Sequence, residues 1–325
     1  MPNTRKPRCG SLQFLPKKRA KKAYARVHSW TTSKEALPLA FAGYKAGMTH
    51  IIFVDKRNNR LIKNEKRMWP VTVIECPPMT IHSARFYKKS PYGKKLITEV
   101  LNSKPKKHLK RKLVIPKTLK TKFEDITDFD EITVVVHTNP DLTGIGKKKP
   151  EIFEVGLGGS KENKFNYVKE NLGKDLNVKD ILKEGMLTDI HAITAGKGYQ
   201  GPVKRFGISL KSHKSEKARR AAVQGPEGYA KVLFTIPKGG KMGFHQRTDY
   251  NKLILKINEK VDMINPNGGF VRYGELKNPY LLIKGSIPCP SKRLAILTRA
   301  IRPNKKISAD GVNITYISKE SKQGR

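Results

Sequence analysis

The feature that most limits how this chain can fold is its excess of positive charge. The 325 residues include 67 Lys and Arg but only 27 Asp and Glu, a formal net charge of +40 at pH 7. Such a charge repels itself in a compact fold unless a polyanion is present. We therefore expect a chain that binds nucleic acid or an anionic membrane surface, rather than a monomeric enzyme acting on a neutral metabolite.

The positive charge is concentrated in segments that contain few acids. Residues 1–30 hold nine Lys and Arg and no acid, interleaved with aromatic residues. This pattern is typical of an extended tail that becomes ordered on a polyanion, although a solvated leader is the alternative. Residues 195–231 are basic and rich in Gly and Ser, which predicts a long functional loop. Residues 85–122 and 276–309 are two further basic clusters.

Residues 123–191 have the opposite character, with 14 acids against nine Lys. Short helical patterns occur at 168–172 and 180–185 within this segment. We interpret it as part of an α/β insertion that faces away from the polyanion and toward other proteins.

Short β-branched segments separated by Gly, Pro and Asn predict a mainly β fold. Such segments suggest a barrel or a sandwich rather than a parallel sheet. The predicted strands cover residues 51–54, 71–74, 132–136, 187–194, 232–236, 253–257, 280–283, 294–297 and 314–317.

Several functional classes lack support in the sequence. The longest apolar stretch has about seven residues, whereas a membrane span needs about 20. Cys9, Cys76 and Cys289 are far apart and form no CxxC pair, which argues against a disulfide framework or a zinc site. The eight His form no metal-binding spacing, and no catalytic arrangement is recognisable. We expect no enzyme activity, no cofactor, no metal site and no membrane span.

Two further patterns allow alternative interpretations. The segment 196–201 matches GxGxxG, but Pro202 and a basic run follow where a dinucleotide fold needs a helix, so close approach of the backbone to phosphate is favoured. His213 and His245 lie in basic, Gly-containing contexts. Each is either a hydrogen-bonding partner of RNA or an exposed loop histidine.

Five blocks of sequence occur in the order typical of one known family. They are PRCGSLQFLPKKRA at 7–20, GYKAGMTH at 43–50, TAGKGYQG at 194–201, GFHQRTDYNK at 243–252 and KGSIPCPSKR at 284–293. Over nearly its whole length, the chain resembles the archaeal and eukaryotic ribosomal protein L3 family.

The resemblance implies a translation-factor-like β-barrel with an α insertion. The expected organisation is a basic N-terminal extension (1–36), the first part of the barrel (37–84), an α/β insertion (85–186), the second part of the barrel (187–318) and a C-terminal tail (319–325). A finger loop at 195–231 would project from the second part of the barrel.

The resemblance also implies a function. The protein would be a cytoplasmic, structural constituent of the large ribosomal subunit. It would bind 23S-type rRNA near its 3′ end, nucleate subunit assembly and support the peptidyl-transferase centre through the finger loop. Its expected protein neighbours are L14 and L24e, and no small-molecule substrate is implied.

The residues expected to bind rRNA are cations and histidines of the basic segments and family blocks. They are Arg5, Lys6, Arg8, Lys17, Lys18, Arg19, Lys21, Lys22, Arg26, Lys197, Lys204, Arg205, Lys211, His213, Lys214, Lys217, Arg219, Arg220, His245, Arg247, Lys284, Lys292 and Arg293. Tyr199, Phe206, Phe244 and Trp30 are candidates for base stacking, with core packing as the alternative.

Two positions depart from the family pattern. The finger tip of many relatives carries a Trp-His pair, where this chain has Glu227 and Gly228, followed by Tyr229. Cys289 stands where relatives usually have Gly, which bears on whether the local turn has a positive φ.

Two rival functions remain open from the residues alone. A chromatin-type architectural protein on duplex DNA would follow the same charge logic, because both polymers bind cations through counterion release. An RNA-modifying enzyme would need a cofactor site, and the sequence offers none.

Overall fold

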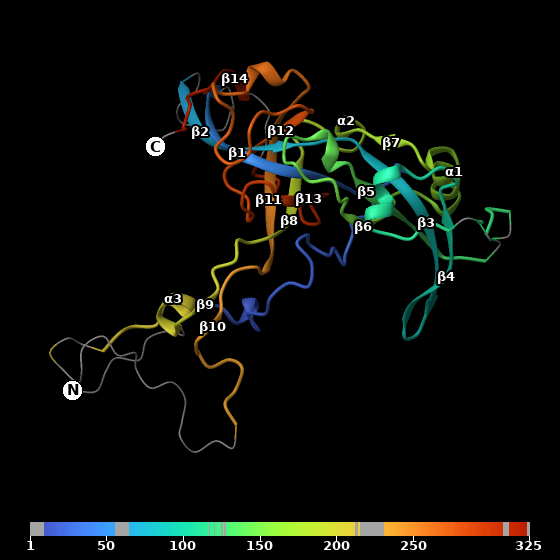
Figure 1. The fold of residues 1–325 in the computed structure, drawn as a ribbon, viewed down its shortest axis with the longest axis horizontal. Helices are drawn as coiled ribbons and strands as arrows, with labels where there is room; N and C mark the ends of the chain where they lie inside the picture. Colours follow the sequence, from blue (N-terminus) through green and yellow to red (C-terminus); the bar gives the residue numbers. More distant parts are fainter. Residues whose placement is uncertain are drawn as a thin grey trace. The chain divides into compact units, whose positions relative to one another are not determined.

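The computed structural model describes residues 10–55, 65–116, 118–119, 121–124, 126, 128–211, 214, 231–307 and 312–323. The chain divides into two compact units (Figure 1). Unit 1 comprises Met1–Ala23 and Ile193–Arg247, and unit 2 comprises Tyr24–Ala192 and Thr248–Arg325. Each unit therefore combines stretches that are distant in the sequence.

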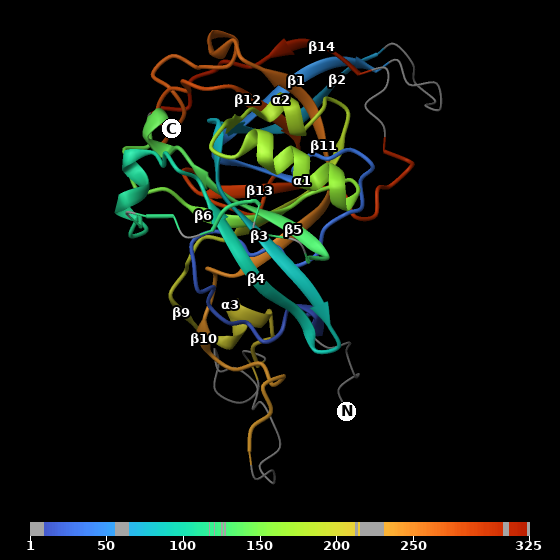
Figure 2. The same ribbon diagram turned by 90° about the vertical axis from the view of Figure 1, so that its right-hand side faces the viewer.

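The larger sheet of unit 2 has seven strands (Figure 2). Its strands, in spatial order, are β13 (Leu294–Arg299), β8 (Leu187–Ile193), β11 (Gln246–Asn258), β12 (Tyr280–Lys284), β2 (Lys66–Glu75), β1 (Ala40–Asp55) and β14 (Val312–Ile317). β1 also pairs with β13 along residues 40–44, so the sheet curls back on itself. The strands of this curled sheet all come from residues 37–84 and 187–318, the two segments that were expected to form a β-barrel.

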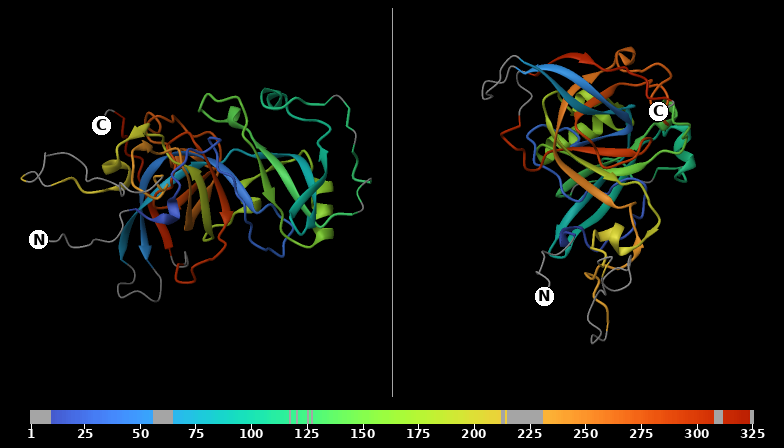
Figure 3. Two further views of the ribbon diagram at one scale, coloured as in Figure 1. Left: turned by 90° about the horizontal axis from the view of Figure 1, so that it is seen from below. Right: turned by 90° about the vertical axis from the view of Figure 1, so that its left-hand side faces the viewer.

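The alternation of side chains explains why these segments form strands. On β1, Ile51 and Phe53 are fully buried, whereas Ile52 and Val54 are partly exposed. This period of two is the strand period, and β-branched and aromatic residues fit it well. β1 and β2 form a long antiparallel pair, visible in both views of Figure 3. The prediction of a mainly β fold is confirmed.

A second sheet of unit 2 has the spatial order β4-β3-β5-β6, with β7 paired to β3. Its strands are β3 (Met79–Ser90), β4 (Gly93–Leu101), β5 (Glu131–Thr138), β6 (Ile152–Gly156) and β7 (Asp175–Leu176). The helices of unit 2 are η2 (Lys107–Arg111), η3 (Pro140–Leu142), α1 (Lys161–Asn171), α2 (Val178–Ile181) and η4 (Val261–Met263). Among the described residues, no helix is long and apolar enough to cross a membrane.

Aromatic packing attaches α1 to the second sheet. Ser160 caps the helix, because its hydroxyl accepts a hydrogen bond from the backbone N–H of Asn163 at 3.3 Å. Phe165 of α1 lies 6.2 Å from Phe86 of β3 and 5.9 Å from Phe129, measured between ring centroids. Such aromatic pairs stabilise a core beyond the area that they bury.

Buried carboxylates fix two parts of the core of unit 2. Glu75, fully buried at the end of β2, accepts hydrogen bonds from the Tyr273 hydroxyl, the backbone N–H groups of Lys277 and Asn278, and the Asn278 side chain. The Tyr44 hydroxyl donates to Glu151 at 2.7 Å. Buried charges are tolerated where hydrogen bonds replace water in this way.

Unit 1 contains short elements. They are η1 (Leu12–Phe14), β9 (Tyr199–Gln200), α3 (Pro202–Phe206) and β10 (Gly240–Lys241), and β9 pairs with β10. α3 begins at Pro202 because proline suits the first position of a helix. It ends at Gly207, which has a φ of 69° in the left-handed region.

Two local expectations were wrong in unit 1. The segment 232–236 forms a turn instead of a strand, and Phe234 within it is 69% exposed. A β-branched pattern favours a strand only where a neighbour accepts its backbone, and no strand of the described chain pairs with this segment. The expectation that no helix follows the 196–201 motif was also wrong, although α3 has only five residues.

Candidate nucleic-acid interface

The described part of unit 1 is strongly basic. Its described residues contain fourteen Lys and Arg and no Asp or Glu. The cations are Lys17, Lys18, Arg19, Lys21, Lys22, Lys197, Lys204, Arg205, Lys211, Lys214, Lys231, Lys238, Lys241 and Arg247. No carboxylate in this part of the unit neutralises them, and such a concentration of one sign of charge favours binding of an anion.

Backbone carbonyls, rather than a large apolar core, hold the unit together. The Arg205 guanidinium donates to the carbonyls of Lys17 (3.1 Å), Lys238 (3.1 Å) and Lys241 (3.2 Å). Lys17 in turn donates to the carbonyl of Arg205 at 2.6 Å. The planar fork of an arginine can make several such bonds at once, which a lysine cannot. Arg205 therefore connects the N-terminal segment, α3 and the β10 region.

Phe206 and Phe14 add cation–π contacts to this network. The Lys17 ammonium lies 4.1 Å from the centroid of the Phe206 ring, and the Arg247 guanidinium lies 4.9 Å from that of Phe14. Burial lowers the pKa of Lys17, and the neighbouring cations Arg205 and Arg247 lower it further. Burial also lowers the pKa of Arg247. Lys17, Arg205 and Arg247 thus take part in the internal structure of the unit.

His245 is an internal residue rather than an exposed loop histidine. It is only 6% exposed, and its Nδ1 lies 2.8 Å from the carbonyl oxygen of Lys18. Burial is the largest cause that lowers its pKa; the Lys18 carbonyl opposes this shift, and Arg247, Arg205 and Lys17 reinforce it. The histidine attaches the N-terminal segment to the start of β11.

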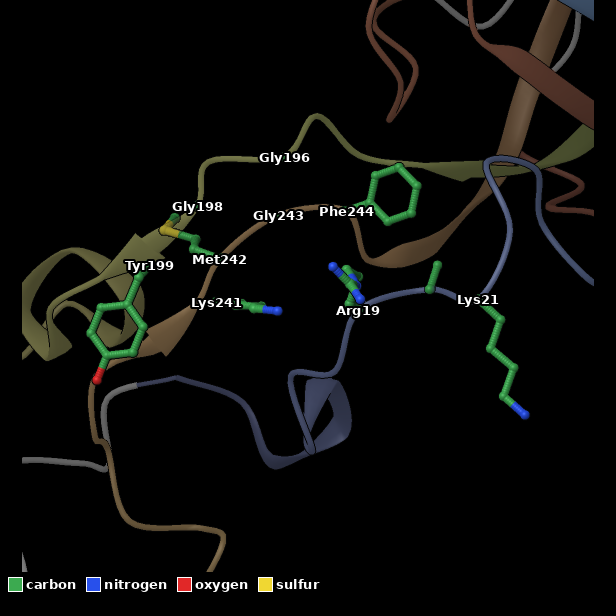
Figure 4. Close-up of a pocket in the computed structure, with 10 residues that line it drawn as sticks. Arg19, Lys21, Gly196, Gly198, Tyr199, Lys241, Met242, Gly243 and Phe244 are labelled. Carbon is green, nitrogen blue, oxygen red and sulfur yellow. The ribbon is translucent and has the colours of Figure 1, made fainter.

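A hollow of about 630 Å³ opens between the N-terminal segment and the β9–β10 pair, all within unit 1 (Figure 4). It is lined by Arg19, Ala20, Lys21, Gly196, Gly198, Tyr199, Lys241, Met242, Gly243 and Phe244. The cations Arg19, Lys21 and Lys241 are exposed, and the Tyr199 side chain is 75% exposed. The hollow therefore combines positive charge, exposed aromatic surface and open glycine backbone.

Glycine is required at one side of this hollow. Gly243 has a φ of 74°, and a β carbon placed there would lie 2.0 Å from the carbonyl oxygen of Ala195. Phe244 follows with a φ of 52°, which is unusual for a residue with a side chain. Two backbone hydrogen bonds stabilise this turn. The Lys197 N–H donates to the Met242 carbonyl at 2.9 Å, and the Met242 N–H donates to the Gly198 carbonyl at 2.8 Å.

The predicted rRNA-binding residues fall into three groups. Within unit 1, exposed side chains belong to Lys18, Arg19, Lys21, Lys22, Lys197, Lys204 and Lys214, while Lys17, Arg205, Lys211, His245 and Arg247 are partly or fully buried. Unit 2 holds Arg26, Lys284, Lys292 and Arg293. Arg5, Lys6, Arg8, His213, Lys217, Arg219, Arg220, Glu227, Gly228 and Tyr229 lie outside the described residues.

The predicted residues of unit 2 have individual local roles. The Lys284 ammonium lies 3.6 Å from the centroid of a Trp69 ring, and burial lowers the pKa of Arg293. Lys292 is exposed with a φ of 68°. Cys289 is buried and has no positive φ, so this turn does not require glycine at that position.

The predicted stacking residues are also sorted by the structure. Tyr199 is exposed, Phe206 is buried in unit 1, and Phe244 is partly buried beside the hollow. Trp30 packs against the core of unit 2. Its ring lies against Gly156, because a β carbon placed on that glycine would be 2.8 Å from the ring.

Lys238, Lys241 and Met242 were missed by sequence reasoning. The predicted loop ended at residue 231, where a strand was expected, so the basic Gly-Gly-Lys segment after it was not assigned to the site. That Gly-Lys composition, in a stretch without acids, was the available signal. In the described part of the chain, no group of three His, Cys, Asp or Glu side chains is arranged to hold a metal ion.

Comparisons with known proteins agree on one family. A family model described as Ribosomal protein L3 matches residues 1–128 and 114–324. The chain is 45% identical over 334 residues to the large ribosomal subunit protein uL3 of Methanothermobacter thermautotrophicus, with 98% of each chain covered. It is 46% identical over 330 residues to the protein of that name from Methanobrevibacter smithii, with 98% of each covered. Identity to the Archaeoglobus fulgidus protein of that name is 44% over 330 residues, covering 98% of this chain and 99% of the relative.

Proposed function

The chain belongs to the ribosomal protein L3 family and is a structural protein of the large ribosomal subunit, not an enzyme; we propose that it binds 23S-type rRNA directly through unit 1. The single observation that carries this proposal is the absence of Asp and Glu from the described part of unit 1, against fourteen cations. An rRNA backbone supplies the missing negative charge, and cations that replace condensed counterions give both affinity and salt dependence.

The finer parts of the function follow from the same assignment. We propose that binding occurs near the 3′ end of the rRNA, that it nucleates subunit assembly, and that the 195–231 finger supports the peptidyl-transferase centre. L14 and L24e are the proposed protein neighbours. The acidic segment 123–191, with 14 acids, lies in unit 2, whereas the described part of unit 1 contains no acid, which supports a division between RNA-facing and protein-facing parts.

The cations that face solvent, rather than those that hold the unit together, are expected to contact RNA. Lys18, Lys197 and Lys204 are exposed. Arg205 and Lys17 are already bonded to carbonyls, and their loss would disturb the unit itself. RNA recognition that depends on shape and phosphate suits a lysine-rich surface of this kind.

The test removes Lys18, Lys197 and Lys204 together by substitution with Ala and measures affinity for a 23S-type rRNA fragment across a salt series. Each lost phosphate contact should reduce the log–log salt slope by about 0.7–0.9, so the triple variant should lose roughly two to three units. The matched control replaces Lys149, Lys169 and Lys183, three exposed lysines of the acidic segment, and should keep the slope. An unchanged slope in the first variant, or equal losses in both, would contradict the proposal.

A further inference from the structure

The hollow of unit 1 is suited to a small ligand. Its volume of about 630 Å³ lies within the usual range of sites that enclose one ligand, roughly 300–1,000 Å³. A double helix is too wide to enter it. The candidates are therefore a single nucleotide, a lone phosphate group or an acidic side chain.

The charges lining the hollow select an anion. Arg19 comes from the N-terminal segment and Lys241 from β10, and in Figure 4 the Lys241 side chain extends toward that of Arg19. Bringing two cations together is unfavourable unless an anion lies between them, and the described part of unit 1 contains no carboxylate. A phosphate placed between Arg19 and Lys241 would satisfy both.

The aromatic lining goes beyond what a phosphate alone requires. Tyr199 is 75% exposed on β9, at one end of the hollow. The backbone beside it is open, because a β carbon on Gly198 would have no heavy atom within 4 Å. Proteins recognise unpaired RNA bases by stacking them on such exposed rings.

From these features we infer that the hollow holds one unpaired nucleotide of RNA, with its phosphate between Arg19 and Lys241 and its base stacked on Tyr199. This inference rests on the proposed function and makes it more specific. Exposed lysines elsewhere on unit 1 contact phosphates without regard to base pairing, whereas the hollow distinguishes a free base from a paired one. An acidic side chain would match the charge but leave the ring unused.

The test compares two single-stranded RNA octamers with equal numbers of phosphates, one of adenosines and one that is abasic at every position. The wild-type protein should bind the base-containing octamer more tightly, by roughly 5- to 150-fold, since one stacked base contributes that much. Tyr199→Leu should remove this preference, while Tyr199→Trp should keep it and show quenched indole fluorescence on binding. Arg19→Ala combined with Lys241→Ala should weaken the binding of both octamers.

Tyr92→Leu is the matched control, because Tyr92 is a fully exposed tyrosine of unit 2. It should keep the preference for bases. Equal binding of the two octamers by the wild-type protein, or an undiminished preference in Tyr199→Leu, would overturn the inference while leaving the proposed function intact. Failure of the proposed function would instead appear as an unchanged salt slope in the Lys18, Lys197 and Lys204 variant.

Discussion

Mild acid should destabilise unit 2 through His137. This residue lies on β5, is 1% exposed, and its Nδ1 is 3.3 Å from the carbonyl oxygen of Thr138. Burial lowers its pKa to about 4, and His108, Lys106 and His82 contribute in the same direction, while the Thr138 carbonyl opposes them. In the unfolded chain a histidine has a pKa of about 6.5.

The sign and size of the effect follow from the two pKa values. The pKa of the folded state is depressed, so His137 favours folding above pH 6.5, and this contribution is lost as the pH falls toward 4. The difference of about 2.5 pKa units corresponds to about 3 kcal/mol in the free energy of unfolding. Most of that loss should be present at pH 4.5.

The assay is urea unfolding of the full chain, followed by tryptophan fluorescence between pH 4.5 and 7.5. His137→Asn keeps an amide donor near the Thr138 carbonyl but cannot titrate, so its stability should fall with acid by about 2–3 kcal/mol less than that of the wild type. His28→Asn, at an exposed position, is the control and should follow the wild type. Parallel pH profiles for the wild type and His137→Asn would refute the reasoning.

Two further substitutions test features of the fold. Gly243→Ala should disrupt the turn at the hollow, because the added carbon would lie 2.0 Å from the Ala195 carbonyl oxygen. We expect faster hydrogen exchange at the Met242 amide, with unchanged exchange in unit 2. Tyr273→Phe removes one hydrogen-bond donor to the buried Glu75 carboxylate. Urea titrations should show a free energy of unfolding that is lower by about 1–3 kcal/mol. An unchanged value would show that this hydrogen bond does not contribute to stability.

The sheets of unit 2 were predictable because their signal is local. Alternating β-branched residues, such as those around Ile51 and Phe53, mark a strand with one face in a core. The 232–236 segment carries the same pattern and still forms a turn, because the sequence does not reveal whether a neighbouring strand is available. The domain boundaries expected from the family remain predictions.

The charge of the candidate interface was predictable from the sequence, but its detail was not. A stretch without acids is visible in any sequence, and it marks most of unit 1. Charge counting cannot distinguish a cation that faces solvent, such as Lys18, from one that donates to carbonyls, such as Arg205. Charge counting also cannot show that His245 is buried. Its burial depends on packing against Lys18, which is more than 200 residues away in the sequence.

The connection of unit 1 to the rest of the chain has a consequence for its evolution. The chain leaves unit 2 at the end of β8 and returns at the start of β11, and these strands are neighbours in one sheet. Neighbouring strands lie about 4.8 Å apart, so the inserted segment spans a short gap whatever its length. Each doubling of such an excursion costs only about 0.6 kcal/mol in closure entropy. Insertions and deletions can therefore accumulate between these two strands without altering the register of the sheet that carries them.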